Sequence, residues 1–155
     1  MGRKFLALLA AGLVTAVTAP AAGDAPLPGA GADWASHGGG SDESGYSRLT
    51  QIDSKNVRQL GLAWALDLPG EVTLEGTPLA VGGIVYFSGS YSAVYAVDGA
   101  SGRLLWKFDP EMWRHYPERI GNMFGVNRGV AYDSGRVFVG VTDGRLIALD
   151  ARSGR

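Results

Sequence analysis

The fold is decided by the stretch Ala96-Val97-Asp98-Gly99-Ala100-Ser101-Gly102-Arg103-Leu104-Leu105-Trp106, because the chain begins to repeat it. From Ala148 the sequence continues Ala-Leu-Asp-Ala-Arg-Ser-Gly-Arg, at an offset of 52 residues (148 − 96) and without a gap. The same register extends backwards and places Val85 on Val137 and Tyr86 on Phe138. A recurrence near 50 residues with several short strands in each unit is typical of β-propeller blades and related arrays.

Each copy of the stretch has the features of a β-hairpin. Residues 94–97 and 104–108 have strand-like apolar character, and the turn between them contains Asp98 and Gly102. An Asp side chain accepts backbone N–H groups in turns, and glycine adopts positive φ without strain. We expect Trp106 to pack against a neighbouring sheet. A single copy would fit a plain hairpin with a core Trp, whereas two copies in register favour the array.

The composition narrows the class of protein. The 155 residues carry a formal net charge of −1, include 24 glycines and no cysteine, and are 46 % hydrophobic. This glycine content suits a turn-rich β protein, and the charge gives no reason to expect nucleic acid as a partner. Without cysteine there is no disulfide, thiol nucleophile or Cys-based metal site. His37 and His115 are too isolated to suggest a histidine metal site.

The chain divides into three parts. Residues 1–21 are expected to be a signal peptide, with Arg3 and Lys4 before a short apolar run and a small-x-small cleavage site at residues 19–21. An uncleaved N-terminal anchor is the alternative, but export to the periplasm is favoured. Residues 22–32 form a Pro/Gly/Ala linker that we expect to be flexible. Residues 33–155 form the folded, all-β part.

The hydrophobic pattern predicts a series of short strands, joined by glycine turns such as Gly82-Gly83. A short helix capped by Ser54 is expected before the first of them. Residues 110–127 are interpreted as a long loop between two repeats, because Asp109-Pro110 ends a strand. The expected strands are 60–68, 77–81, 84–88, 93–97, 104–108, 130–132, 136–141 and 145–149.

Two features resemble a known family. The Asp98-to-Trp106 segment is similar to the tryptophan-docking motif of pyrroloquinoline quinone (PQQ) dehydrogenases, which build an eight-bladed β-propeller. The run from Trp34-Ala-Ser-His-Gly-Gly through residues 46–53 to Trp64 resembles the opening segment of the PQQ alcohol and sugar dehydrogenases. The resemblance implies that residues 33–155 are the N-terminal part of such a propeller, comprising about two blades.

The resemblance also implies a cofactor site. Glu75, in Leu-Glu-Gly-Thr-Pro, and Arg128, in Asn-Arg-Gly-Val-Ala, match positions where the family places residues that bind PQQ. Because they lie 53 residues apart (128 − 75), each before the first strand of a blade, we expect them to approach one axial cavity and to be able to pair. Many relatives carry two adjacent cysteines before this arginine. Here Met123 or Phe124 would cover the quinone instead.

What remains of the family's site is expected beyond residue 155. This includes the calcium ligands and the catalytic Asp base, so the chain contributes no catalytic or metal-binding residue and should not be active alone. The implied activity is oxidation of an alcohol or sugar with hydride transfer to calcium-bound PQQ, and the implied electron acceptor is cytochrome c or a membrane quinone. The alternative function is a non-catalytic, PQQ-like propeller scaffold of the cell envelope.

Overall fold

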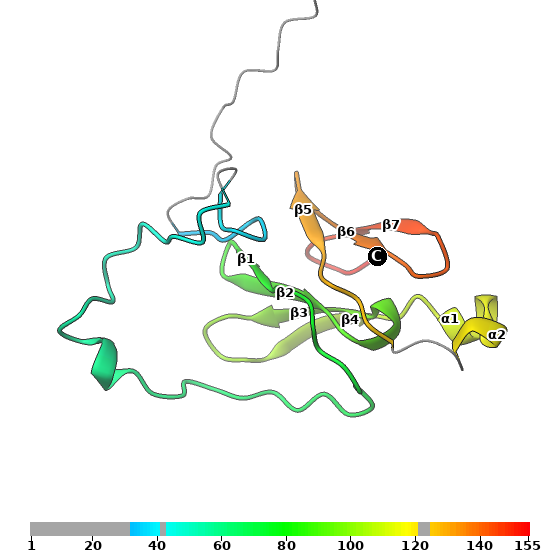
Figure 1. Ribbon diagram of the computed structural model, residues 1–155, viewed down its shortest axis with the longest axis horizontal. Coiled ribbons are helices and arrows are strands. Elements are labelled where there is room, and N and C mark those ends of the chain that lie inside the picture. The colour runs from blue at the N-terminus through cyan, green and yellow to red at the C-terminus, as the bar shows by residue number, and fades with distance from the viewer. Residues whose placement is uncertain (1–31, 41–42, 121–124) are drawn as a thin grey trace, which may run out of the picture.

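Two antiparallel β-sheets form the body of the protein, which we describe from a computed structural model (Figure 1). The structure describes residues 32–40, 43–120 and 125–155. The expected signal peptide and nearly all of the linker therefore lie outside the described residues. The first sheet has the order β1-β2-β3-β4, with β1 at Leu79–Val81, β2 at Ile84–Ser88, β3 at Val94–Asp98 and β4 at Leu104–Phe108.

The second sheet repeats the first at the offset predicted from the sequence. Its order is β5-β6-β7, with β5 at Ala131–Asp133, β6 at Arg136–Gly140 and β7 at Leu146–Asp150. Each strand begins 52 residues after its counterpart, as in 131 − 79 and 136 − 84. The strand predictions within both repeats are thus confirmed to within two residues at each end.

The turns of the first sheet are those that the glycines predict. Gly82 and Gly83 connect β1 to β2 with φ values of 58° and 79°, which place both in the left-handed region. At the other end of β3, Gly102 has φ of 73° and its N–H bonds to the Asp98 carbonyl at 2.8 Å. Glycine reaches these conformations without the steric cost that a Cβ would add.

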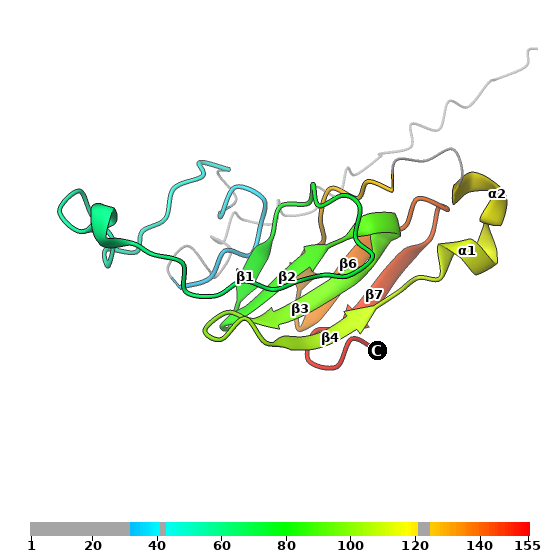
Figure 2. The ribbon, with the colours of Figure 1, turned by 90° about the horizontal axis from the view of Figure 1, so that it is seen from below.

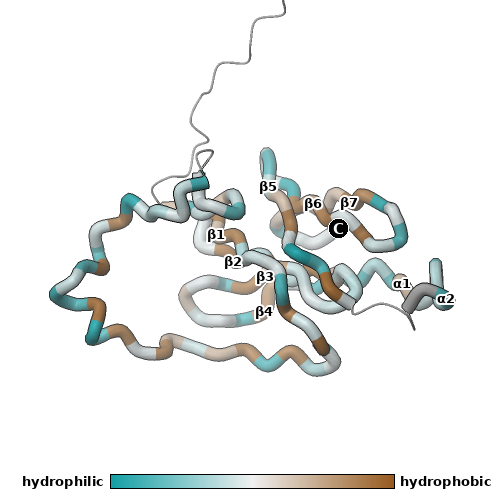
Figure 3. The backbone as a smooth tube through the Cα atoms, in the orientation of Figure 1, coloured by the Kyte–Doolittle hydropathy of each residue, from teal (hydrophilic) through white to brown (hydrophobic). Residues whose placement is uncertain are grey.

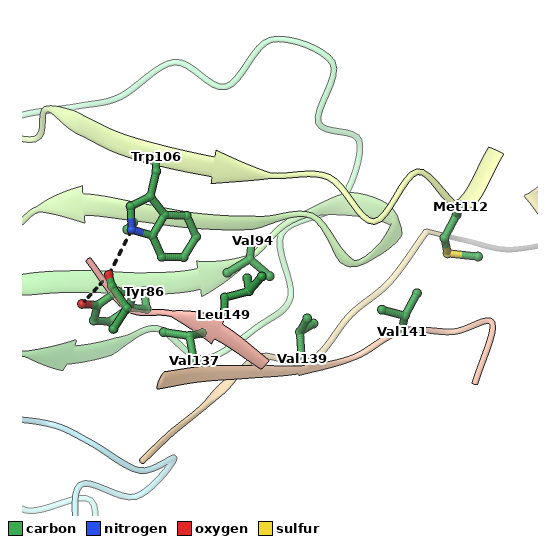
Figure 4. Close-up of a cluster of buried hydrophobic side chains, with 10 residues drawn as sticks. Tyr86, Val94, Trp106, Met112, Val137, Val139, Val141 and Leu149 are labelled. Atoms are coloured by element: carbon green, nitrogen blue, oxygen red, sulfur yellow. Dashed lines mark hydrogen bonds between the residues drawn. The ribbon is translucent and has the colours of Figure 1, made fainter. Parts of the chain in front are cut away.

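The hydrophobic core lies between the two sheets (Figure 4). Alternate residues of each strand face it, since successive side chains of a strand point to opposite faces. Trp106 is 9 % exposed, and its Nε1 donates to the carbonyl of Ala151 in the neighbouring sheet at 3.0 Å. The prediction that Trp106 packs against a neighbouring sheet is confirmed. The buried side chains of this core are Tyr86, Val94, Ala96, Trp106, Met112, Val137, Val139, Val141, Leu149 and Ala151.

A second tryptophan docks on the first sheet in the same manner. Trp64 Nε1 donates to the Gly99 carbonyl at 2.9 Å, and Gly99 precedes Ala151 by 52 residues (151 − 99). The Trp64 ring lies over Gly102 as the Trp106 ring lies over Gly154. The segment that contains Trp64 thus covers the outer face of the first sheet, opposite the second sheet (Figure 2).

The prediction of a strand over residues 60–68 is wrong, although half-buried and exposed side chains do alternate along it. Trp64, Leu66 and Leu68 are half-buried while their neighbours are exposed, yet the segment joins no sheet. A strand needs a partner for its backbone groups, and no neighbouring strand among the described residues supplies one. The Ser54 cap is also wrong, because Asp53 Oδ1 accepts the N–H groups of Lys55 and Asn56 before the 3-10 turn η1, Val57–Gln59.

The expected loop between the repeats contains two single-turn helices, α1 at Met112–His115 and α2 at Pro117–Ile120. Arg145 fastens this insertion to the second sheet by donating to the Pro110 carbonyl at 2.7 Å and pairing with buried Asp143. No helix in the part of the chain that the structure describes is long and apolar enough to cross a membrane. Apolar residues are instead distributed along both sheets and the segment before β1 (Figure 3).

Candidate functional site

The segments that lead into β1 and β5 lie side by side at one end of the two sheets. Thr77 and Gly129 form a parallel β-bridge, in which Thr77 N–H donates to the carbonyl of Arg128 at 3.3 Å. Because Glu75 lies two residues before this bridge and Arg128 directly before it, the structure brings the two predicted site residues onto adjacent backbone segments.

Gly76 permits this close approach. A Cβ atom built on Gly76 would lie 2.5 Å from Ser88 Oγ and 3.0 Å from the backbone nitrogen of Gly129. Gly129 has φ of 133°, a conformation that side chains with a Cβ rarely adopt. Glycine is therefore required where the two segments touch, and this requirement explains the glycine next to each predicted site residue.

The charged groups of Glu75 and Arg128 are exposed. Within the ranges that the structure describes, neither side chain makes a hydrogen bond or an ion pair, so the two do not pair with each other here. Met123 and Phe124, the residues expected to cover the quinone, lie outside the described residues.

The segment that carries Glu75 is anchored by Glu71, which the sequence analysis did not single out. The Glu71 carboxylate is 7 % exposed and accepts hydrogen bonds from the Tyr95 hydroxyl and the Ser90 N–H, with Lys107 Nζ at 3.9 Å. Ser90 Oγ in turn accepts from the N–H groups of Val72 and Thr73 at 2.8 and 3.0 Å. Residues 71–73 are thereby fixed to the turn between β2 and β3.

The environment of Glu71 favours its charged form. Burial raises the pKa of this carboxyl, but the bonds from Tyr95 and Ser90 together with the charge of Lys107 outweigh it and hold the pKa below its ordinary value of 4.5. Burial and the bond to Glu71 raise the pKa of the Tyr95 hydroxyl. The neighbouring Tyr95 hydroxyl, followed by nearby negative charge, raises the pKa of Lys107 despite its partial burial. All three groups therefore keep their ordinary charges at neutral pH.

The segment that leads into β5 and carries Arg128 is held in place by Thr73 and by its own Asn127. Thr73 Oγ1 donates to the Gly125 carbonyl at 3.3 Å, and Tyr91 N–H donates to the same carbonyl at 2.8 Å. The Asn127 side chain donates to Ser92 in the turn between β2 and β3 and to Gly140 at the end of β6. These residues could not be found by a motif search for catalytic or charged groups, since each acts through neutral hydrogen bonds between distant segments.

No group of three or more His, Cys, Asp or Glu side chains suitable for a metal ion occurs among residues 32–40, 43–120 and 125–155. The two predicted site residues supply one cation and one carboxylate on neighbouring segments. Such a pair can bind an anionic group and accept a hydrogen bond from the same ligand.

Residues 34–155 match the family described as PQQ glucose/ethanol/alcohol dehydrogenase, beta-propeller domain. Among curated proteins, the chain is 51 % identical over 126 residues to the quinohemoprotein alcohol dehydrogenase ADH IIB of Pseudomonas putida, a match that covers 81 % of this chain and 18 % of that protein. It is 44 % identical over 126 residues to the 1-butanol dehydrogenase (cytochrome c) of Thauera butanivorans, again covering 81 % of this chain and 18 % of the relative.

Solved structures agree with this assignment. The quinohemoprotein alcohol dehydrogenase ADHIIG of Pseudomonas putida superposes with a TM-score of 0.72 at 49 % identity, and that of Comamonas testosteroni with 0.71 at 46 %. Each superposition covers 79 % of this chain and 18 % of the other, so the chain spans about a fifth of the length of these relatives. The family match over residues 34–155 confirms the predicted fold, and the chain belongs to the PQQ alcohol dehydrogenase family, with its two sheets as neighbouring blades of the β-propeller.

Proposed function

We propose that this chain is the N-terminal portion of an exported, periplasmic PQQ-dependent dehydrogenase that oxidises a small alcohol or sugar. The similarity to quinohemoprotein alcohol dehydrogenases supports the enzyme over a non-catalytic propeller scaffold of the cell envelope. One observation carries the proposal for this chain's own residues. The Thr77–Gly129 bridge sets Glu75 and Arg128 on adjacent segments, and neither charged group bonds to another of the described residues.

The donor set fits PQQ, a planar quinone that carries three carboxylates. The Arg128 guanidinium offers a planar fork of N–H donors for a carboxylate, a contact that a lysine ammonium cannot reproduce. Glu75 contributes an acceptor and a negative charge that can orient Arg128 once a ligand has ordered both side chains. PQQ, when bound, supplies the electron-accepting quinone for oxidation of the alcohol.

The remaining parts of the site would come from outside residues 1–155. They comprise the calcium ligands and the Asp base that takes the proton of the substrate hydroxyl. Two relatives bear names that specify electron acceptors, cytochrome c for the Thauera enzyme and quinone for the dehydrogenase subunit of Gluconobacter oxydans. We extend these to the present protein as its candidate acceptors, cytochrome c or a membrane quinone.

The test is reconstitution of the full-length apo-protein that carries this sequence, by titration with PQQ in the presence of calcium. Arg128→Ala should weaken PQQ binding about tenfold to a hundredfold, because a hydrogen bond to a charged group contributes about 1.5–3 kcal/mol. Arg128→Lys should recover only part of this loss. Glu75→Gln should weaken binding less and reduce turnover more, if its role is to orient Arg128.

Arg58→Ala is the matched control, since Arg58 is an exposed arginine of η1, a turn that belongs to neither segment. It should bind PQQ as the wild type does. If Arg128→Ala reconstitutes at the wild-type PQQ concentration, Arg128 is not a cofactor ligand and the proposed site is wrong.

A further inference from the structure

Asn127 immediately precedes Arg128, and its side-chain amide makes three hydrogen bonds. Its Oδ1 accepts the N–H of Gly129 at 3.1 Å, while Nδ2 donates to Ser92 Oγ at 2.9 Å and to the Gly140 carbonyl at 2.9 Å. The backbone carbonyl of Asn127 accepts a further bond from Ser88 Oγ at 3.1 Å. Four hydrogen bonds therefore hold this one residue.

The bond from Gly129 closes a turn around Arg128. An Asn side chain that accepts the N–H two residues later forms an Asx turn, which fixes the backbone of the residue between them. That residue is Arg128, and its carbonyl is the acceptor of the Thr77 N–H in the bridge to the Glu75 segment. The Asn127 side chain thus fixes the backbone conformation on both sides of Arg128.

The two Nδ2 bonds tie the same residue to the turn between β2 and β3 and to the second sheet. Ser92 is fully buried in the turn between β2 and β3, and Gly140 ends β6 of the second sheet. Ser88, which donates to the Asn127 carbonyl, ends β2. The position of the Arg128 Cα is consequently determined by both blades rather than by a loop, as a precise binding site requires.

We infer that Asn127 is a positioning residue that holds Arg128 in the orientation needed to bind an anionic carboxylate of the cofactor. This inference rests on the proposed function of Arg128. Through its Oδ1, Asn127 presets the backbone at Arg128, so that less of the binding free energy is spent on ordering this segment. Through its Nδ2, it contributes to the stability of the interface between the blades. The two roles use different atoms of one side chain and can be separated.

The experiment measures the dissociation constant of PQQ with the full-length apo-protein, by quenching of intrinsic fluorescence, together with the melting temperature of the apo-form. Asn127→Ala removes both roles, and we expect PQQ to bind about threefold to tenfold more weakly, as for loss of a neutral hydrogen bond. Asn127→Ser keeps a hydroxyl that can accept the Gly129 N–H in an analogous turn. It should bind PQQ within about threefold of the wild type, with a melting temperature as low as that of Asn127→Ala.

The matched control is Asn56→Ala, because the Asn56 side chain also donates to a carbonyl, that of Gln51, and accepts an N–H, that of Asp53. It should leave the PQQ dissociation constant unchanged. If Asn127→Ala binds PQQ as the wild type does, or if the Ala and Ser variants lose affinity equally, the positioning role is overturned. Should Asn127→Ala not fold, the test rests on Asn127→Ser alone. A loss of PQQ affinity in this variant as large as that of Arg128→Ala then overturns the inference.

A double-mutant cycle separates this inference from the proposal on which it rests. If Asn127 acts through Arg128, then Asn127→Ala has no further effect on PQQ binding in the Arg128→Ala background. Additive losses would overturn the positioning role and leave Arg128 as a ligand. An unchanged dissociation constant for Arg128→Ala alone would instead refute the proposed site itself.

Discussion

Glu71 illustrates how a charged residue can support a proposed binding site that it does not touch. Its carboxylate is nearly buried and is surrounded by the Tyr95 hydroxyl, the Ser90 N–H and the Lys107 ammonium. A buried carboxylate without partners would be costly, whereas one with several donors fixes all of them in place. Here the fixed elements are the turn between β2 and β3 and the segment that leads to Glu75.

The lowered pKa of Glu71 predicts a pH dependence of stability. A carboxyl whose pKa is lower in the folded state than in the unfolded state stabilises the fold fully above the unfolded value, here 4.5. The contribution is lost as the pH falls through the folded value. We expect Glu71→Gln to destabilise the full-length protein by about 1.5 kcal/mol at pH 7, as for one bond to a charged group. The difference from the wild type should shrink below pH 4.5.

Melting curves of both proteins between pH 3 and pH 7 would measure this difference. Glu118→Gln is the control, since Glu118 is an exposed carboxyl of α2, and exposed charges contribute little. A destabilisation by Glu71→Gln that stays constant over the whole pH range would show that the ionised form of Glu71 is not what stabilises the fold.

At the scale of the element, the turn after β3 is the unit that accepts a tryptophan. Asp98 Oδ1 receives the N–H and the hydroxyl of Ser101 at 2.8 and 2.7 Å, and Asp150 receives those of Ser153 at 2.9 and 2.8 Å. These bonds stabilise a turn in which a glycine leaves room for an indole ring. The turn therefore joins one blade to the tryptophan of the preceding segment.

The close docking of Trp64 predicts that Gly102 is needed for two separable reasons. Gly102→Ala would introduce a Cβ at positive φ and 2.6 Å from the Trp64 ring, where backbone conformation and crowding both oppose it. Gly83→Ala is the matched control, because Gly83 has φ of 79° and no atom within 4 Å of the position that a Cβ would take. We expect about 1–2 kcal/mol for Gly83→Ala and about 1–3 kcal/mol more for Gly102→Ala.

Chemical denaturation of the two variants in the full-length protein would give the free energies of unfolding. Trp64 fluorescence should also change in Gly102→Ala, because its indole has to move away from the turn. Equal destabilisation by the two substitutions would mean that the ring accommodates a methyl group, and that close docking on this turn is not required.

The individual elements show which parts of the fold can be predicted from a single sequence. The 52-residue recurrence predicts the strands of both sheets because a repeated unit repeats its hydrogen-bonding pattern. The docking of Trp64 was not predicted, since Trp64 precedes Trp106 by only 42 residues (106 − 64) while the turns that they contact are 52 apart. The helices α1 and α2 are each one turn long. They are too short for hydrophobic periodicity, and contacts such as that of Arg145 with Pro110 fix the insertion that contains them.

At the scale of the whole molecule, the arrangement of the candidate site was only partly predictable. Glu75 and Arg128 could be named from motifs, and the repeat indicated that they lie at equivalent ends of neighbouring blades. Their anchors Glu71 and Asn127 could not, because most of the hydrogen bonds of these anchors join positions 13 to 39 residues apart. Such contacts exist only once both sheets have formed, and no local pattern in the sequence encodes them.

The described residues expose much apolar surface for so small a body. Leu62 is 85 % exposed and Leu146 76 %, and Val72 and Leu74 are also exposed. Neither β4 nor β7 has a further strand on its outer side in the part described. Unpaired strand edges and contiguous apolar patches both favour association with other chains. In a closed propeller, neighbouring blades cover such surfaces.

We therefore predict that residues 33–155, expressed alone, are aggregation-prone or only partly folded. The isolated piece should bind a hydrophobic dye and elute as concentration-dependent oligomers, because each blade is stabilised chiefly by its neighbours. Light scattering with dye fluorescence measures both properties, and the full-length protein is the reference. Replacing Leu62 and Leu146 by Lys should reduce the association without restoring a cooperative melt, since charge blocks contact but adds no core. A monomeric sample with a cooperative melt and no dye binding would contradict this, and would mean that the core between the two sheets is sufficient to stabilise them.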